Sequence, residues 1–133
     1  MTNVEVKNMA FQPGMELWVK GVPSKTSRSF SINVGTDDKN IALYVSVHFN
    51  DSAYRNVIIM NYVKAGVRGE EVRVTDFPFQ PEQEFEVTIT LDDKFHIILP
   101  GDKTVTFLNN LAAVPYNKIW ANGDVKVRGI SIK

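Results

Sequence analysis

Apolar residues occupy every second position over many short segments of this chain, and turn-forming residues separate these segments. Phe85–Leu91 alternates in this way with charged or hydroxyl residues, a turn of acidic residues follows, and residues 95–99 repeat the alternation. Because successive side chains of a strand point to opposite faces, the pattern predicts strands with one buried face. No long helical period occurs. We therefore expect an all-β fold, either a sandwich or a barrel.

Polar residues alternate with apolar ones most regularly in residues 44–74. A strand over residues 44–50 would bury Val45, Val47 and Phe49, and Tyr44 and Ser46 would line the opposite face. The same alternation separates Val72 and Val74 from their polar neighbours. Three consecutive strands would then place five polar side chains on one face of a sheet: His48, Asn50, Asn61, Glu71 and Arg73.

This set of side chains suits a hydroxyl-rich ligand better than bond cleavage. An imidazole, two carboxamides, a carboxylate and a guanidinium supply the donors and acceptors that adjacent sugar hydroxyls need. Glu71 and Arg73 share a face and can pair, which would keep the carboxylate ionised and make it a poor general acid. The alternative is that these residues form an ordinary solvated face of an antiparallel sheet.

The same residues resemble the carbohydrate-recognition segment of galectins, which reads His-x-Asn-Pro-Arg, then Val-x-Asn, then Trp-Gly-x-Glu-x-Arg. The chain has HFN at residues 48–50, IMN at 59–61, with Ile59 in place of the valine, and RGEEVR at 68–73. The likeness extends to VKNMAFQPGMELWVKG at 6–21, VTDFPF at 74–79, FEVTITLDDKFHIIL at 85–99 and ANGDVKVRGISI at 121–132.

The resemblance covers nearly the whole chain and implies a galectin-type jelly-roll sandwich of two antiparallel sheets. It also implies one carbohydrate-recognition domain over residues 1–133, with the polar face concave and Ser46 extending the groove. The length and the 44% hydrophobic content fit one domain. The expected ligands are β-galactosides or related glycans and glycoproteins.

Two recognition elements of the family are replaced. Asp51 and Ser52 stand where galectins have Pro-Arg, and Arg68 stands where they have the tryptophan that packs under galactose. Losing a charged hydrogen bond and an aromatic contact would cost roughly 2 to 4.5 kcal/mol, about 30-fold to 2,000-fold in affinity. Arg55 could replace the lost guanidinium in part, and Arg68 could lie under a sugar or pair with Glu70.

Composition excludes several other functions. The formal net charge is zero and the basic residues are scattered, so we expect no nucleic-acid or anionic-membrane partner. The absence of cysteine removes disulfides, thiolate nucleophiles and thiolate metal sites. No cofactor is expected. The N-terminal residues lack the apolar core of a signal peptide, which favours a cytoplasmic protein, and no apolar run is long enough to span a bilayer.

We assign no function to three local motifs. The sequon at Asn50 is a chance match, and the acidic pair at 37–38 is a solvated turn rather than a metal site. Ser52, His48 and Asp51 lie too close along the chain for a catalytic triad, so we expect no enzyme and no catalytic residue.

Two functional classes remain open: a lectin with weakened or shifted specificity, and a galectin-fold interaction module that has lost sugar binding. A lipid-binding barrel is a weaker alternative, since the chain offers no clear helical lid. The resemblance is compatible with a homodimer formed through the terminal strands. It also permits an extracellular role by secretion without a signal peptide.

Overall fold

The computed structural model describes residues 2–51, 53–112 and 115–133, and these residues form strands joined by turns and loops. One sheet runs in the order β1 (Thr2–Phe11), β11 (Tyr116–Gly123), β3 (Ser29–Asp37), β4 (Asn40–Asn50), β5 (Arg55–Lys64) and β6 (Val67–Arg68), and β7 (Val72–Val74) also pairs with β5. The other sheet runs β10 (Lys103–Leu108), β9 (Lys94–Leu99), β8 (Phe85–Leu91), β2 (Glu16–Pro23) and β12 (Val125–Ile132).

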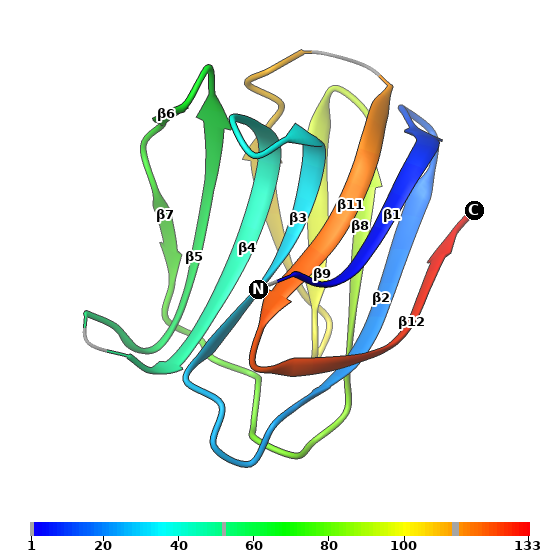
Figure 1. Cartoon of the computed structure of the whole chain (residues 1–133). Helices are drawn as coiled ribbons and strands as arrows, with labels where there is room; N and C mark the ends of the chain where they lie inside the picture. Colours follow the sequence, from blue (N-terminus) through cyan, green and yellow to red (C-terminus); the bar gives the residue numbers. More distant parts are fainter. Residues whose placement is uncertain (1, 52, 113–114) are drawn as a thin grey trace.

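The two sheets pack face to face, and neighbouring strands within each sheet are antiparallel (Figure 1). β6 and β7 lie at one side of the sandwich, and β1 and β12 lie at the other. The prediction of an all-β sandwich of two antiparallel sheets is therefore confirmed. No helix of the described residues is long and apolar enough to cross a membrane.

The core lies between the sheets and is built from the apolar positions of the alternating segments. In β4, Val45 and Val47 are fully buried and Phe49 is nearly so, whereas the residues between them remain partly accessible. β8 and β9 contribute Val87, Ile89, Leu91, Phe95, Ile97 and Leu99 from the opposite sheet. Burial of one such side chain stabilises the fold by about 1.5–3 kcal/mol.

An aromatic cluster holds the end of β4 in place from inside the sandwich. The ring of Phe49 lies 5.2 Å from Phe77 and 6.2 Å from Phe30, measured between centroids. Phe30 in turn stacks on Phe85 at 5.2 Å and meets Phe79 edge-on. Because Phe49 is fixed between the rings, its neighbours His48 and Asn50 are held on the outer face of the sheet.

Two turns bind each other at the opposite end of β4. The backbone N–H of Gly66, in the turn after β5, donates to the carbonyl of Lys39 at 2.9 Å, and the N–H of Ala65 donates to the Asn40 side chain at 3.1 Å. Within the β3–β4 turn, the Asp37 carboxylate accepts from the backbone N–H of Lys39 at 2.8 Å. The acidic pair is thus part of a turn closed by its own side chain.

β7 differs in one respect from the alternation of its sequence. Val74 is buried, as predicted, but Val72 is 39% exposed. β7 has only three residues and lies at the edge of its sheet, so Val72 borders an open hollow with Leu108 instead of entering the core.

A candidate carbohydrate-binding groove

A row of side chains crosses the outer face of the seven-stranded sheet. Ser31 of β3 is the register partner of Ser46 of β4, which is opposite Ile59 of β5, and Ile59 is opposite Arg73 of β7. Residues directly opposite each other on adjacent strands point to the same face. His48 belongs to the next row of the same face, two residues along β4.

A groove of about 580 Å³ lies over these rows. It is lined by residues of β3, β4, β5 and β6 and of the turns and loops beside them: Ser31, Asp38, Lys39, Ile41, Tyr44, Ser46, His48, Tyr54, Ile59, Val63, Gly66, Arg68 and Glu71. Hydroxyl groups, charges of both signs and apolar side chains all reach this groove. Such a mixture fits a ligand that has hydroxyls on its edges and C–H groups on its faces.

His48 is hydrogen-bonded through both ring nitrogens. Nδ1 lies 2.5 Å from an oxygen of Asp51, and Nε2 lies 2.9 Å from the Ser46 hydroxyl. Against an ionised carboxylate Nδ1 must carry a hydrogen, so in the neutral ring Nε2 accepts from Ser46. A sugar hydroxyl could donate to Nε2 in place of Ser46, since the imidazole is held in that tautomer.

Asp51 follows directly after the HFN segment and supports the ring of His48. Partial burial raises the pKa of the Asp51 carboxyl, but hydrogen bonds from His48 and from the backbone N–H groups of Ala53 and Tyr54 outweigh this effect and lower the pKa overall. The carboxylate therefore stays ionised at neutral pH. It fixes the ring of His48 and the loop between β4 and β5 at the same time.

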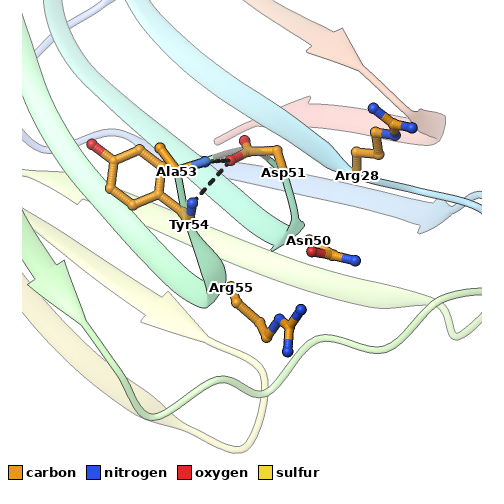
Figure 2. A pocket seen from close by; sticks show the side chains of 6 residues that line it. All are labelled: Arg28, Asn50, Asp51, Ala53, Tyr54 and Arg55. Carbon is orange, nitrogen blue, oxygen red and sulfur yellow. Dashed lines mark hydrogen bonds between the residues drawn. The ribbon is translucent and has the colours of Figure 1, made fainter.

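Tyr54, which the sequence did not single out, forms an aromatic wall of the groove. Its ring centroid lies 4.7 Å from that of His48, and the guanidinium carbon of Arg73 lies 5.1 Å from the Tyr54 ring centroid. The Asp51 carboxylate accepts from the Tyr54 N–H at 3.1 Å, and the Tyr54 carbonyl accepts from the Asp51 N–H at 3.0 Å. These bonds close the loop, and Tyr54 lines the groove. The hydrogen bond from the Tyr54 N–H to Asp51 is drawn in Figure 2.

Arg73 and Glu71 form the ion pair that their spacing predicts. Arg73 Nε donates to a carboxylate oxygen of Glu71 at 3.0 Å, and both side chains remain accessible, at 56% and 36%. Glu71 lines the groove, and Arg73 adjoins it through Glu71 and Tyr54. The pair is exposed enough to exchange partners with a ligand.

Arg68 lies at the groove and not beside Glu70. It is exposed on β6, and among the described residues it takes part in no ion pair, whereas Glu70 lines a neighbouring hollow under Tyr62 and Val72. The predicted ion pair with Glu70 is therefore not formed among the described residues, and contact of Arg68 with a ligand stays a prediction.

Asn61 is part of the structural support of the groove. Its side chain is only 4% exposed, its amide donates to the carbonyl of Gly69 at 3.0 Å, and its oxygen accepts from the Tyr62 N–H at 2.8 Å. These bonds tie β5 to the segment that leads to Glu71. Asn61 lies directly opposite Tyr44, a residue of the groove, in the strand register. Its carboxamide is nevertheless hydrogen-bonded to backbone groups.

Asn50 and Arg55 lie in a second hollow next to the groove, here called the edge pocket. This pocket has a volume of about 540 Å³ and is lined by Arg28, Asn50, Asp51, Ala53, Tyr54 and Arg55 (Figure 2). Tyr54 lines both the groove and the edge pocket. Ser52, a predicted site residue, lies outside the described residues.

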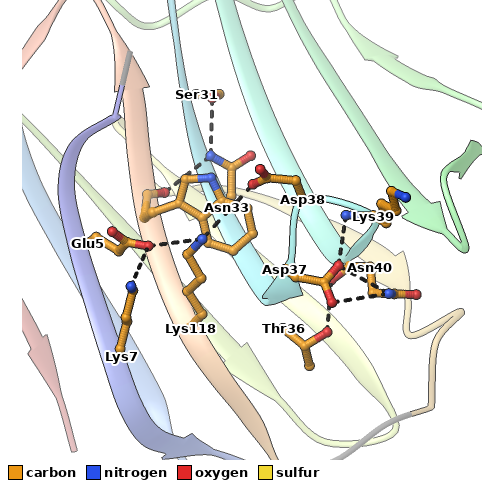
Figure 3. A network of polar contacts seen from close by, with 11 residues as sticks. Glu5, Lys7, Ser31, Asn33, Thr36, Asp37, Asp38, Lys39, Asn40 and Lys118 are labelled. Carbon is orange, nitrogen blue, oxygen red and sulfur yellow. Dashed lines mark hydrogen bonds and ion pairs between the residues drawn. The ribbon is translucent and has the colours of Figure 1, made fainter.

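The face continues as a polar network beyond Ser31, toward β11 and β1 (Figure 3). The Asn33 amide donates to the Ser31 hydroxyl and to the Trp120 carbonyl, both at 3.2 Å. Lys118 Nζ lies 2.9 Å from Glu5 and 4.4 Å from the centroid of the Trp120 ring. A hydrogen bond from Lys118 is the main reason that the pKa of Glu5 is lowered.

The sequence prediction named six of the residues that line the groove: Tyr44, Ser46, His48, Ile59, Arg68 and Glu71. It did not assign to the groove the other lining residues, which are Ser31, Asp38, Lys39, Ile41, Tyr54, Val63 and Gly66, and it interpreted Asp38 as part of a solvated turn. Ser31 alternates with Phe30 and Ile32 in the same way as Ser46 with its neighbours, so its alternation would have revealed it once β3 was paired with β4. Tyr54 had no such signal, because its position depends on the loop that Asp51 closes. Among the described residues, no three His, Asp or Glu side chains are close enough to hold a metal ion.

Comparisons with known proteins give one consistent result. The family model described as "Galactoside-binding lectin" matches residues 2–132. Galactose-binding lectin l-1 of Anguilla japonica is 38% identical over 99% of this chain and 94% of its own length, and galectin-1 of Ovis aries is 35% identical over 95% and 94%. The crystal structure of lactose- and MES-liganded congerin II superposes with a TM-score of 0.93 at 34% identity, over 98% of each chain.

Proposed function

The chain belongs to the galactoside-binding lectins, the galectin family, and we propose that it binds β-galactosides or related glycans in its groove with a shifted specificity. The family consists of lectins without enzymatic activity, so the chain is not an enzyme. A relative of the same fold is described with lactose bound, which supports a glycan of this class as the ligand.

The observation that carries the proposal is the supported histidine within the cross-strand row. His48 is oriented by Asp51, and Ser46 and Glu71 lie in the same groove with Arg73 beside them. Together they provide acceptors and donors along one edge of the groove. A sugar ring lying there would place its hydroxyls against these groups and its C–H face against an apolar or aromatic side chain.

The shift in specificity follows from the replaced positions. The tryptophan that galectins place under galactose is Arg68 here, and the wall opposite is supplied by Tyr54. A sugar in this groove would therefore meet an aromatic ring from the β4–β5 loop. We expect weaker binding of unmodified lactose than the family usually shows, and stronger binding of a glycan that contacts both Tyr54 and Arg68.

A second candidate function is an interaction module without sugar binding. It is favoured by Asn61, whose carboxamide is buried and bonded to Gly69 and Tyr62. In that case the groove would bind a partner protein, or none, and substitution of His48 would leave partner binding intact.

Screening the purified protein on a glycan array tests the proposal directly. Lactose and the strongest array ligand are then titrated against wild type, His48→Ala and His96→Ala by calorimetry. His96 is the other histidine of the chain and lies on β9 in the opposite sheet, so it is the matched control. We expect His48→Ala to lower affinity at least about tenfold, because a charge-supported hydrogen bond is lost, and His96→Ala to have no effect.

The contrary result would be a folded protein that is silent across the array. The proposal would also be contradicted if neither His48→Ala nor His96→Ala changed the affinity for a glycan. Either outcome would favour the interaction module.

The remaining proposals concern context. We propose one carbohydrate-recognition domain over residues 1–133, glycoproteins as natural partners, and a homodimer formed by the open edges of β1 and β12. From the family we also propose a cytoplasmic location with secretion independent of a signal peptide.

A further inference from the structure

The edge pocket gathers three polar side chains from three neighbouring chain segments. The Arg28 carbonyl accepts from the N–H groups of Phe49, at 2.8 Å, and Asn50, at 3.3 Å, so Arg28 lies beside the end of β4. Asn50 is the register partner of Arg55 on β5. Figure 2 shows the side chains of Arg28, Asn50 and Arg55 around this one pocket, which they line together.

The two guanidinium groups of this pocket have no carboxylate partner. Among the described residues, Arg73 pairs with Glu71 and Arg128 pairs with Glu84, but no ion pair is formed by Arg28 or Arg55. Both of these arginines are exposed. Their donors are therefore free to bind a ligand.

The nearest carboxylates are occupied by other groups. Asp51 accepts from His48 and from the N–H groups of Ala53 and Tyr54. Asp124 accepts from the backbone N–H of Arg28 at 3.0 Å and not from its guanidinium. The pocket therefore has two cationic groups and a carboxamide directed at open space, and this combination favours an anion with several oxygen atoms.

We propose that the edge pocket binds a sulfate or carboxylate group carried by a glycan whose neutral sugar occupies the groove. The inference rests on the proposed function, because the sugar delivers the anion. Tyr54 lines both hollows, so they adjoin each other and one ligand can extend from the groove into the edge pocket. Arg28 and Arg55 hold the anion, and Asn50 donates to it from between them.

Paired glycans that differ in one anionic group test this inference. Lactose is compared with its 3′-sulfated, 6′-sulfated, 3′-sialylated and 6′-sialylated derivatives in titrations against wild type, Arg28→Gln, Arg55→Gln and Arg128→Gln. Arg128 is the matched control because it lies on β12 of the other sheet. The sulfated and sialylated arms separate a sulfate ligand from a carboxylate ligand.

We expect at least one anionic derivative to bind wild type about tenfold more tightly than lactose. This ratio should fall toward one in Arg28→Gln and in Arg55→Gln, and stay unchanged in Arg128→Gln. It should also fall as salt is raised from 0.05 to about 0.5 M, since exposed charges are screened. Equal affinities for lactose and all four derivatives would overturn the inference, and so would a gain that survives both substitutions.

A second measurement separates this inference from the proposed function. Inorganic sulfate is titrated into the protein while the side-chain Nε–H signals of the arginines are followed by NMR. If the protein binds no glycan, the proposed function fails. Anion binding by the edge pocket is then still supported if the signals of Arg28 and Arg55 shift with sulfate while that of Arg128 does not. If the signals of all three arginines respond alike, the proposal that the edge pocket binds an anion fails as well.

Discussion

At the scale of single residues, His48 and the two side chains that hold it decide what the groove can recognise. Asp51 orients the ring through Nδ1, and Ser46 meets Nε2. Tyr54 packs on the ring and belongs to the same short loop as Asp51. This short loop thus supplies a carboxylate, from Asp51, and an aromatic ring, from Tyr54, to the surroundings of His48.

Tyr54 gives the first prediction at this scale. Tyr54→Ala removes the aromatic wall and should lower affinity for the best array glycan roughly 2-fold to 10-fold, the range of one aromatic contact. Tyr54→Phe keeps the ring and serves as the control, so its affinity should stay near that of wild type. Titration calorimetry on both variants measures this. Equal losses in the two would assign the effect to the hydroxyl group and contradict a stacking role.

Asp51 gives a prediction about pH. Its folded-state pKa is lowered, so it stabilises the fold above its unfolded pKa of about 3.9 and loses that contribution as the pH falls below this value. Asp51→Asn should therefore lower stability by about 1 kcal/mol at pH 7 and at pH 5, somewhat less than a fully buried charged hydrogen bond contributes, because the carboxylate is 25% exposed. Urea unfolding measures the difference.

The difference between wild type and Asp51→Asn should shrink at pH 3. If it grew with acidity instead, the carboxylate would be unfavourable in the fold, and its role as the support of His48 would be rejected.

At the scale of elements, β4 carries the site and β5 anchors it. β4 buries its apolar positions in the core and presents Ser46 and His48 outside, while β5 is buried on both faces over residues 57–61. The segment between β6 and β7 is tied to β5 through Asn61 and Gly69. Glu71 and Arg73 depend on this tie for their position.

Gly69 gives a prediction at this scale. A Cβ at this position would lie 2.0 Å from the Tyr62 ring, so Gly69→Ala must displace the ring or the backbone. Overpacking of this kind costs about 1–3 kcal/mol, and the displaced segment should also weaken glycan binding. Urea unfolding and lactose titration measure the two effects. Gly129→Ala is the control, because a Cβ there meets no atom within 4 Å; if both variants behaved like wild type, the Gly69 contact would carry no weight.

The alternation of β4, β8 and β9 was sufficient to predict their strands and buried faces from the sequence. It failed for Val72, because β7 is a three-residue strand at the edge of its sheet and Val72 borders an open hollow that Leu108 of β10 also lines. It also did not indicate that Asn61 would be occupied by the Gly69 carbonyl, a contact made by a segment without regular alternation. Register brings Ser46 and Ile59 together, as the resemblance implied, whereas Tyr54 reaches the groove through loop contacts that no periodicity encodes.

At the scale of the whole molecule, both terminal strands lie at the same side of the sandwich, and each is an edge of its sheet (Figure 1). Unpaired backbone groups on β1 and β12 can accept a second copy of the chain. The groove lies over β3, β4, β5 and β6, away from these edges, so pairing would leave it open.

Light scattering after size exclusion tests self-association. We expect a mass of twice the 15.0 kDa of one chain, falling toward the single-chain mass on dilution, because edge pairing obeys mass action. The chain has no formal net charge, so the experiment is repeated well above and below the isoelectric point near 6.7 to separate specific pairing from colloidal association. A single-chain mass at every concentration would reject the dimer.

Tyr54 also has a consequence for how the protein can change over evolution. This residue lines both the groove and the edge pocket, so one codon acts on both surfaces at once. A mutation that adapts the chain to a different neutral sugar would alter its acceptance of an acidic substituent in the same step. Descendants of such a chain would change their preference for whole glycan epitopes in single jumps, and the separate parts of an epitope would not drift independently.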